Sequence, residues 1–287
     1  MTNAPRLSSC TDASVTTMLT SSFAQRLIQT ELGQISLREK GTGPVNVVCL
    51  HGISSSAASW VRVAELLPER YRLIAWDAPG YGQSDPISSV KVSAADYAQR
   101  LDAMLKALLI EKCMIVGHSL GAITASAYCS HLCSAEIEKL LLLSPAQGYG
   151  NPTLVEQREQ VRKSRLADLN DLGIEATAEK SHTRLVANQK DERALAIVKW
   201  SMRRLNEVGL RQAIDLLCYS DLLALLPGCS MLNVSVGCGT DDPITPPAKC
   251  EVVAKICGVP LLDIPQAGHA CYIEKPKAVL EMLQAMT

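Results

Sequence analysis

One serine in the segment IVGHSLGAITA, residues 115–125, has a glycine two positions away on either side. An apolar run precedes it and a run of small residues follows it, which predicts a strand, a sharp turn at Ser119 and a helix. Gly117 and Gly121 suit such a turn, because its strained backbone crowds the serine against both neighbouring elements. A helix starting here would direct N–H groups at an anion beside Ser119. This setting favours a nucleophile over a simple helix start.

A serine hydroxyl is a weak nucleophile at neutral pH and needs a base to take its proton. The chain has five histidines. His269 stands in the loop IPQAGHACYIEKP, after a predicted strand and before the last predicted helix, and is the preferred base. The other four suit wall, backbone or solvent-facing positions: His51, His118, His131 and His182.

A base of this kind needs a carboxylate to hold its tautomer. The segment GCGTDDPITPP follows the predicted strand MLNVSV and offers Asp241 and Asp242, one of which can be the acid. Two backbone N–H groups should hold the oxyanion that forms on attack. We expect these at Ile53, in the loop HGIS after an apolar strand, and at Leu120, directly after the nucleophile.

Composition excludes several other classes of function. The 287 residues are 47% hydrophobic and 20% charged, with a net charge of −1 and interspersed signs. No nucleic-acid or membrane partner is therefore expected, since there is no basic patch and no apolar run of transmembrane length. The 11 cysteines have irregular spacings without a CxxC pair, so we expect no metal and a reduced, cytoplasmic protein.

Strand-like and helix-like segments alternate from residue 24 onward, except in one block. The pattern predicts a hairpin near Gly33, helices at 57–67 and from Ser93 to Leu109, a helix after Pro247 and a last helix from Lys277. The other predicted strands are 45–50, 72–76, 113–117, 137–145, 231–238 and 260–265. Residues 150–226 are expected to be helices without strands, which makes them an insertion in an α/β pattern. Residues 1–23, polar and rich in Ser and Thr, are expected to be a flexible tail.

These features together resemble the α/β-hydrolase fold family. LHG (50–52), WDAPGYGQSD (76–85) and AGHACYIEKP (267–276) are similar to its signatures, and Ser119, Asp242 and His269 follow its chain order. The pattern G-x-x-D-x-x-T-P from Gly239 singles out Asp242 over Asp241. The resemblance implies a mostly parallel eight-stranded sheet flanked by helices, formed by residues 24–149 and 227–287. It also implies an inserted helical cap at 150–226 and a reaction without an organic cofactor or metal.

Within the family the chain resembles enol-lactonases, small esterases and C–C bond hydrolases of aromatic catabolism. Haloalkane dehalogenases and epoxide hydrolases place Asp where this chain has Ser119. C–C hydrolases often carry Trp soon after the catalytic His, whereas Ala270, Cys271 and Tyr272 follow His269 here. They also use a cap arginine for the substrate carboxylate, for which the candidates are Arg158, Arg162, Arg165 and Arg184.

The sequence therefore predicts a serine hydrolase of a carboxylic ester or lactone of a small organic acid. The alternative is a C–C bond hydrolase acting on a keto acid from ring cleavage. Rival classes on this scaffold are a cofactor-free oxygenase, haloperoxidase or lyase, and a ligand-binding protein without catalysis. Gly52, His118, Tyr149 and Cys271 are the expected substrate-binding residues, in a monomer or homodimer.

Overall fold

The computed structural model describes residues 11–89 and 91–285. Eight strands form one sheet in the order β1-β2-β4-β3-β5-β6-β7-β8. The strands are β1 (Gln25–Thr30), β2 (Gly33–Lys40), β3 (Val45–Leu50), β4 (Tyr71–Trp76), β5 (Lys112–His118), β6 (Glu136–Leu143), β7 (Val234–Gly239) and β8 (Leu261–Ile264). β2 pairs antiparallel with β1 and β4, and all other pairs are parallel. The predicted mostly parallel eight-stranded sheet is confirmed.

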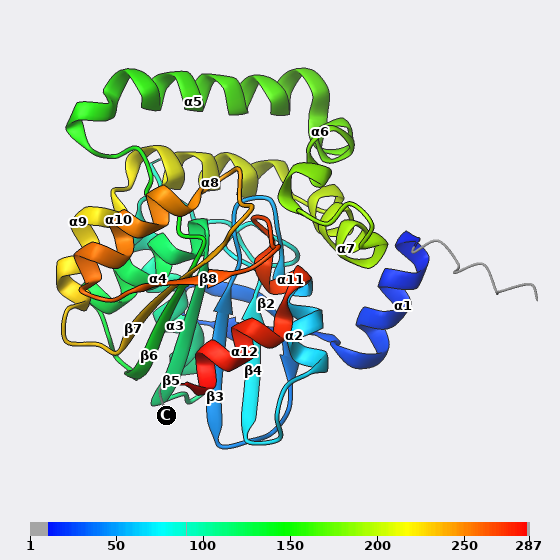
Figure 1. Ribbon diagram of the computed structural model, residues 1–287, viewed down its shortest axis with the longest axis vertical. Coiled ribbons are helices and arrows are strands. Elements are labelled where there is room, and N and C mark those ends of the chain that lie inside the picture. The colour runs from blue at the N-terminus through cyan, green and yellow to red at the C-terminus, as the bar shows by residue number, and fades with distance from the viewer. Residues whose placement is uncertain (1–10, 90, 286–287) are drawn as a thin grey trace, which may run out of the picture.

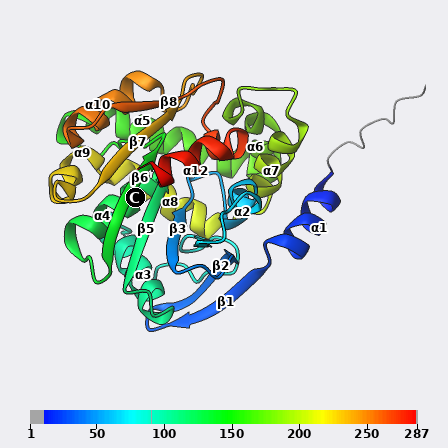
Figure 2. The ribbon, with the colours of Figure 1, turned by 60° about the horizontal axis from the view of Figure 1, so that its bottom comes forward.

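Helices cover both faces of this sheet (Figures 1 and 2). They are α1 (Asp12–Ser22), α2 (Val61–Glu65), α3 (Ala94–Ala107), α4 (Leu120–His131), α5 (Val155–Ala167), α6 (Gly173–Ser181), α7 (Glu192–Arg203), α8 (Glu207–Tyr219), α9 (Leu222–Leu225), α10 (Pro247–Cys257), α11 (Cys271–Glu274) and α12 (Pro276–Gln284). Short 3₁₀ segments are η1 (Ala57–Trp60), η2 (Pro152–Leu154), η4 (His182–Leu185) and η5 (Leu226–Cys229), while η3 (Asp168–Leu172) is a π-helix. Across residues 11–89 and 91–285, no helix combines the length and apolarity that crossing a membrane requires.

The two faces of the sheet belong to separate hydrophobic cores, because side chains alternate along a strand. In β3, Val48 and Leu50 join the core that contains α3 and α4. Val47 and Cys49 join the core that contains α1, α2 and α12. Strands buried on both sides explain why these segments read as continuous apolar runs in the sequence.

Helices α5 to α9 lie between β6 and β7. Residues 150–226, where the sequence analysis expects an insertion, are called the inserted segment below. α5 is its outermost element and lies above α8, roughly parallel to it, in Figure 1. None of the 13 residues of α5 is fully buried. Its attachment to α8 includes an ion pair of 2.8 Å between Arg162 Nε and Asp215 Oδ1.

The expectation of a flexible tail at residues 1–23 is wrong for residues 12–22, which form α1. Val15 and Leu19 of this helix are buried in the same core as Phe23, and Trp200 Nε1 donates a hydrogen bond to Thr16 Oγ1 at 3.0 Å. The helix was missed because only a few of its residues are apolar, so its pattern resembles that of a polar tail. Residues 1–10 lie outside the described chain.

Ser93 caps α3 as expected. Its Oγ accepts a hydrogen bond from the N–H of Asp96, and its own N–H donates to the Asp96 carboxylate at 2.8 Å, a reciprocal capping box. We predict that Ser93→Ala lowers the free energy of unfolding by about 1 kcal/mol, because it exposes an unpaired N–H at the helix start. Urea unfolding measures this, with the exposed Ser88→Ala as control; equal stability of the two variants would contradict the cap.

Candidate active site

Ser119 occupies the turn between β5 and α4 with a φ of 53°. The turn is tight on both sides. A Cβ at Gly117 would lie 2.7 Å from the Cα of Ala122, and one at Gly121 would lie 2.3 Å from the carbonyl oxygen of Leu50. Only glycine fits at either position, so the two glycines are required for the backbone conformation that presents Ser119.

His269 and Asp242 meet at this end of the sheet, although they lie 27 residues apart in the chain. The Nδ1 of His269 is 2.9 Å from the Oδ2 of Asp242. A carboxylate only accepts, so Nδ1 carries the proton and Nε2 keeps its lone pair. Thr245 Oγ1 donates to Asp242 Oδ2 at 2.9 Å and lies 3.2 Å from His269 Nδ1. This tautomer is the one that a general base needs.

Asp242 is buried but remains a carboxylate. Burial alone would raise its pKa, but the hydrogen bond and charge of His269 and the N–H groups of Thr245 and Ile244 outweigh it and lower the pKa to about 2. Asp241 is exposed, and its N–H donates to the carbonyl of Ala267 at 3.0 Å. Of the two candidate acids, only Asp242 contacts His269.

The loop that contains Ile53 is held in place by buried polar groups. His51 Nδ1 donates to the carbonyl of Gly52 at 2.8 Å, and its Nε2 accepts from the N–H of Ala78 at 3.0 Å. Tyr81 donates its hydroxyl to the carbonyl of Ile53 at 2.7 Å. The N–H of Ile53 is thus carried on a fixed loop, and that of Leu120 has no acceptor within α4, because Leu120 is the first residue of the helix.

His118 lies beside His269. Its Nε2 donates to the backbone carbonyl of His269 at 2.8 Å, and the two rings are 4.7 Å apart. Burial and the neighbouring His269 lower the pKa of His118 to about 3, so this imidazole stays neutral. His118 lines the cavity between the sheet and the inserted segment, and it also supports the loop of His269.

Ser119 and His269 face the same cavity of about 850 Å³, which lies between the sheet and the inserted segment. Ile53, Leu120, Gly52, His118 and Tyr149 line it too. Within the described chain no hydrogen bond joins Ser119 Oγ to His269 Nε2, a contact that often forms fully only when a substrate is bound. The expectation that Cys271 binds substrate is corrected here, because Cys271 is not among the residues that line the cavity. It starts α11 with its Sγ 4.0 Å from Ser144 Oγ, buried beneath the site.

Two of the four candidate arginines, Arg165 of α5 and Arg184 of η4, line the cavity. Neither makes an ion pair or hydrogen bond to any residue that the structure describes. Arg158 lies against the ring of Tyr219, and Arg162 pairs with Asp215. Arg165 and Arg184 are therefore unpaired cations at the cavity, whereas Arg158 and Arg162 have partners outside it.

The sequence analysis did not anticipate the part that Glu274 plays in the site. Its carboxylate accepts from the N–H of Gly268, next to His269, and from the N–H groups of Ala187 and Asn188 in the inserted segment. Glu274 is five residues after His269, so its position in the signature AGHACYIEKP was the available signal. The spacing of residues in the sequence could not indicate its partners in the inserted segment, Ala187 and Asn188.

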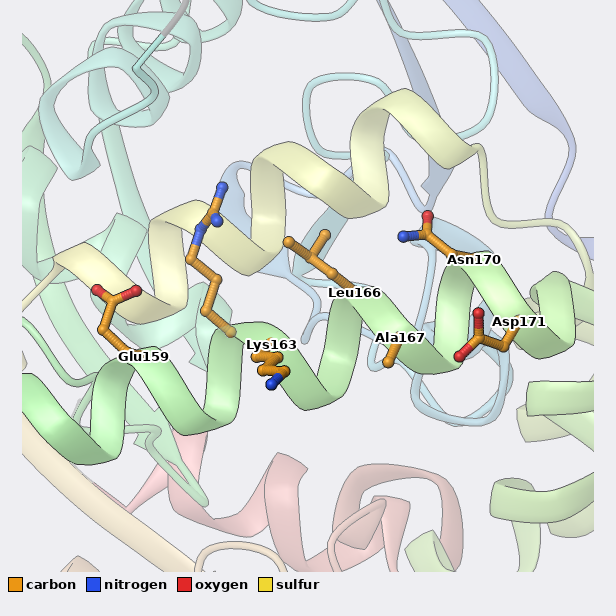
Figure 3. A pocket seen from close by; sticks show the side chains of 7 residues that line it. Glu159, Lys163, Leu166, Ala167, Asn170 and Asp171 are labelled. Carbon is orange, nitrogen blue, oxygen red and sulfur yellow. The ribbon is translucent and has the colours of Figure 1, made fainter.

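A second hollow of about 350 Å³ lies on the outer side of α5, where Figure 3 shows the side chains that border it. These side chains mix both signs of charge, from Glu159 and Lys163 to Asp171, and they include Arg162, one of the four candidate arginines. Among the residues of ranges 11–89 and 91–285, no group of three or more His, Cys, Asp or Glu side chains could hold a metal ion.

Several named proteins are similar in sequence to this chain over part of its length. A Bacillus subtilis protein provisionally named 2-succinyl-6-hydroxy-2,4-cyclohexadiene-1-carboxylate synthase is 28% identical over 80% of this chain and 86% of its own. A 2-hydroxy-6-oxononadienedioate/2-hydroxy-6-oxononatrienedioate hydrolase of Dechloromonas aromatica is 31% identical over 49% of this chain, which spans about half of that relative.

The architecture also matches solved structures. The enol-lactonase of Burkholderia xenovorans LB400 superposes with a TM-score of 0.75 over 91% of this chain and 99% of its own. At 19% identity this likeness shows the fold alone. The family model described as alpha/beta hydrolase fold matches residues 45–276, from β3 to the start of α12. The chain therefore belongs to the α/β-hydrolase fold family.

Proposed function

We propose that the protein hydrolyses a carboxylic ester or lactone of a small organic acid, with Ser119 as nucleophile, His269 as base and Asp242 as acid. The supporting observation is the His269–Asp242 pair, whose tautomer leaves Nε2 free in the cavity that Ser119 faces. Hydrolase names among the relatives agree with this reaction class.

In the proposed reaction, His269 Nε2 takes the hydroxyl proton as Ser119 Oγ attacks the carbonyl carbon. The N–H groups of Ile53 and Leu120 hold the oxyanion. Asp242 remains ionised and stabilises the imidazolium. The protonated His269 then gives its proton to the departing alcohol or enol, and a water molecule cleaves the acyl-enzyme by the same route. His118, neutral throughout, does not compete for the proton.

Residues 150–226 would act as a cap that shapes the pocket over this site. The cavity wall includes apolar residues such as Val161, Val198 and Leu217, together with the unpaired Arg165. Burial and the neighbouring Tyr97 raise the pKa of Tyr81, and the positive charge of Arg165 opposes that rise. An unpaired guanidinium above an apolar wall suits a substrate that carries a carboxylate.

C–C bond hydrolysis is the second candidate, and Arg165 favours it as well. The substrate in the name of the Dechloromonas relative is an oxo diacid with no ester bond, so its hydrolysis has to break a carbon–carbon bond. A keto acid bound through its carboxylate would place its carbonyl near Ser119 in the same manner as an ester.

The first test is hydrolysis of p-nitrophenyl acetate and butyrate. Ser119→Ala should lower kcat by a factor on the order of 10⁴ or more, because the variant cannot form the acyl-enzyme. A fluorophosphonate probe should label the unmodified protein and not the variant. Labelling that persists in Ser119→Ala would contradict the assigned nucleophile.

The two neighbouring aspartates provide a matched pair. Asp242→Asn should lower kcat by a factor on the order of 10³ to 10⁴, because an amide no longer holds the Nδ1–H tautomer or stabilises the imidazolium. Asp241→Asn changes an exposed side chain and should leave kcat within about twofold. Steady-state kinetics of both variants show which aspartate is the acid. A larger loss of kcat in Asp241→Asn than in Asp242→Asn would assign the role to Asp241.

The role of Arg165 is tested with two esters that differ in charge, p-nitrophenyl hemisuccinate and p-nitrophenyl butyrate. Arg165→Met should lower kcat/KM for the anionic ester by about tenfold or more, mainly through KM, because a charge-assisted contact to the carboxylate is lost. The neutral ester should change little. Arg162→Met, which changes an arginine one helical turn away that pairs with Asp215, is the control. Equal losses of kcat/KM on both esters in Arg165→Met would contradict a carboxylate-binding role for Arg165.

A further inference from the structure

The backbone on both sides of His269 is fastened to other parts of the chain. The N–H of Gly268 donates to Glu274 at 2.6 Å, and the carbonyl of His269 accepts from His118 at 2.8 Å. The N–H of Ala270 donates to the carbonyl of Leu185 at 2.7 Å. Three consecutive residues are thus held, one of them directly by the inserted segment.

Glu274 joins the inserted segment to the same loop. Its Oε2 accepts from the N–H groups of Gly268 and Ala187, the latter at 3.1 Å, and its Oε1 accepts from Asn188 at 2.9 Å. The residue is 8% exposed. No lysine or arginine in the described ranges pairs with it. Backbone N–H groups are therefore the partners that compensate this buried charge, and they come from two separate parts of the chain.

The two parts are in close contact. A Cβ on Gly268 would lie 2.8 Å from the N of Ala187 and 3.0 Å from the O of Leu185. Leu185 and its neighbour Arg184 line the cavity, as does Ala270 next to the base. Ala187 and Asn188, which Glu274 binds, therefore lie just after the residues of the cavity wall in the chain. No flexible side chain separates this segment from the loop of His269.

We propose that Glu274 is a positioning residue for His269 and makes the position of the base depend on the inserted segment. This inference rests on the proposed function, in which His269 is the base. A substrate pressed against Arg184 and Leu185 then fixes residues 186–188, and through the shared carboxylate it fixes Gly268 and His269. Substrate specificity and base alignment are coupled through one side chain.

The test compares Glu274→Gln with the unmodified protein. The amide retains the shape but has one acceptor oxygen and sets an NH₂ group against backbone donors. We expect kcat for p-nitrophenyl butyrate to fall by about 10- to 100-fold with KM within about twofold, because misplacing a base costs rate more than binding. The downfield proton resonance of the His269 Nδ1–H bond to Asp242 should shift or broaden. Glu281→Gln, an exposed glutamate on α12, should match the unmodified protein.

Gly268→Ala provides a second variant that leaves the carboxylate intact and pushes residues 185–187 away from the loop. It should reproduce the loss of kcat and the altered resonance, and it decides the matter if Glu274→Gln does not fold. A folded Glu274→Gln or Gly268→Ala protein with unchanged kcat and resonance would overturn the inference, as would a change confined to KM. If the unmodified protein cleaves no ester, the proposed function fails, and the resonance still tests the positioning role by itself.

Discussion

The positive φ of Ser119 is the constraint on which the site depends. A non-glycine residue in such a conformation costs on the order of 1–3 kcal/mol, and the surrounding packing has to maintain it. Here β3, β5 and α4 do so through backbone contacts too close for any side chain at Gly117 or Gly121. The parallel sheet brings these elements together, so the long-range order of the strands fixes a local conformation that the segment 115–125 could not hold alone.

The fold and the candidate triad could be predicted because they leave short-range marks. Ser119 and Asp242 follow the buried strands β5 and β7, and His269 follows the short, partly exposed β8 at the same end of the sheet. Cys271 was misplaced because its neighbour His269 faces the cavity, whereas the start of α11 turns the cysteine toward Ser144. The choice between Arg165 and Arg162 was equally inaccessible. They are one turn apart on α5, and only the position of Asp215 on α8 distinguishes them.

The local electrostatic environment determines which groups at the site are charged and which are neutral. Asp242 is held ionised by donors that converge on it, and His118 is held neutral by burial although it touches the loop of His269. His51 is likewise buried, with both nitrogens committed to backbone groups. Of these three imidazoles, His269 alone has a carboxylate partner, so the same side chain type serves as scaffold twice and as candidate base once.

The absence of fully buried residues in α5 has a consequence for how this protein can change. The inner face of the helix borders the cavity and its outer face meets solvent, so few of its side chains contribute to the cores on either side of the sheet. Substitutions at positions such as Gln157, Gln160 or Ser164 would alter what the cavity accepts at little cost in folding free energy. Substrate preference can therefore drift under selection while the scaffold, and the strained turn within it, stays the same.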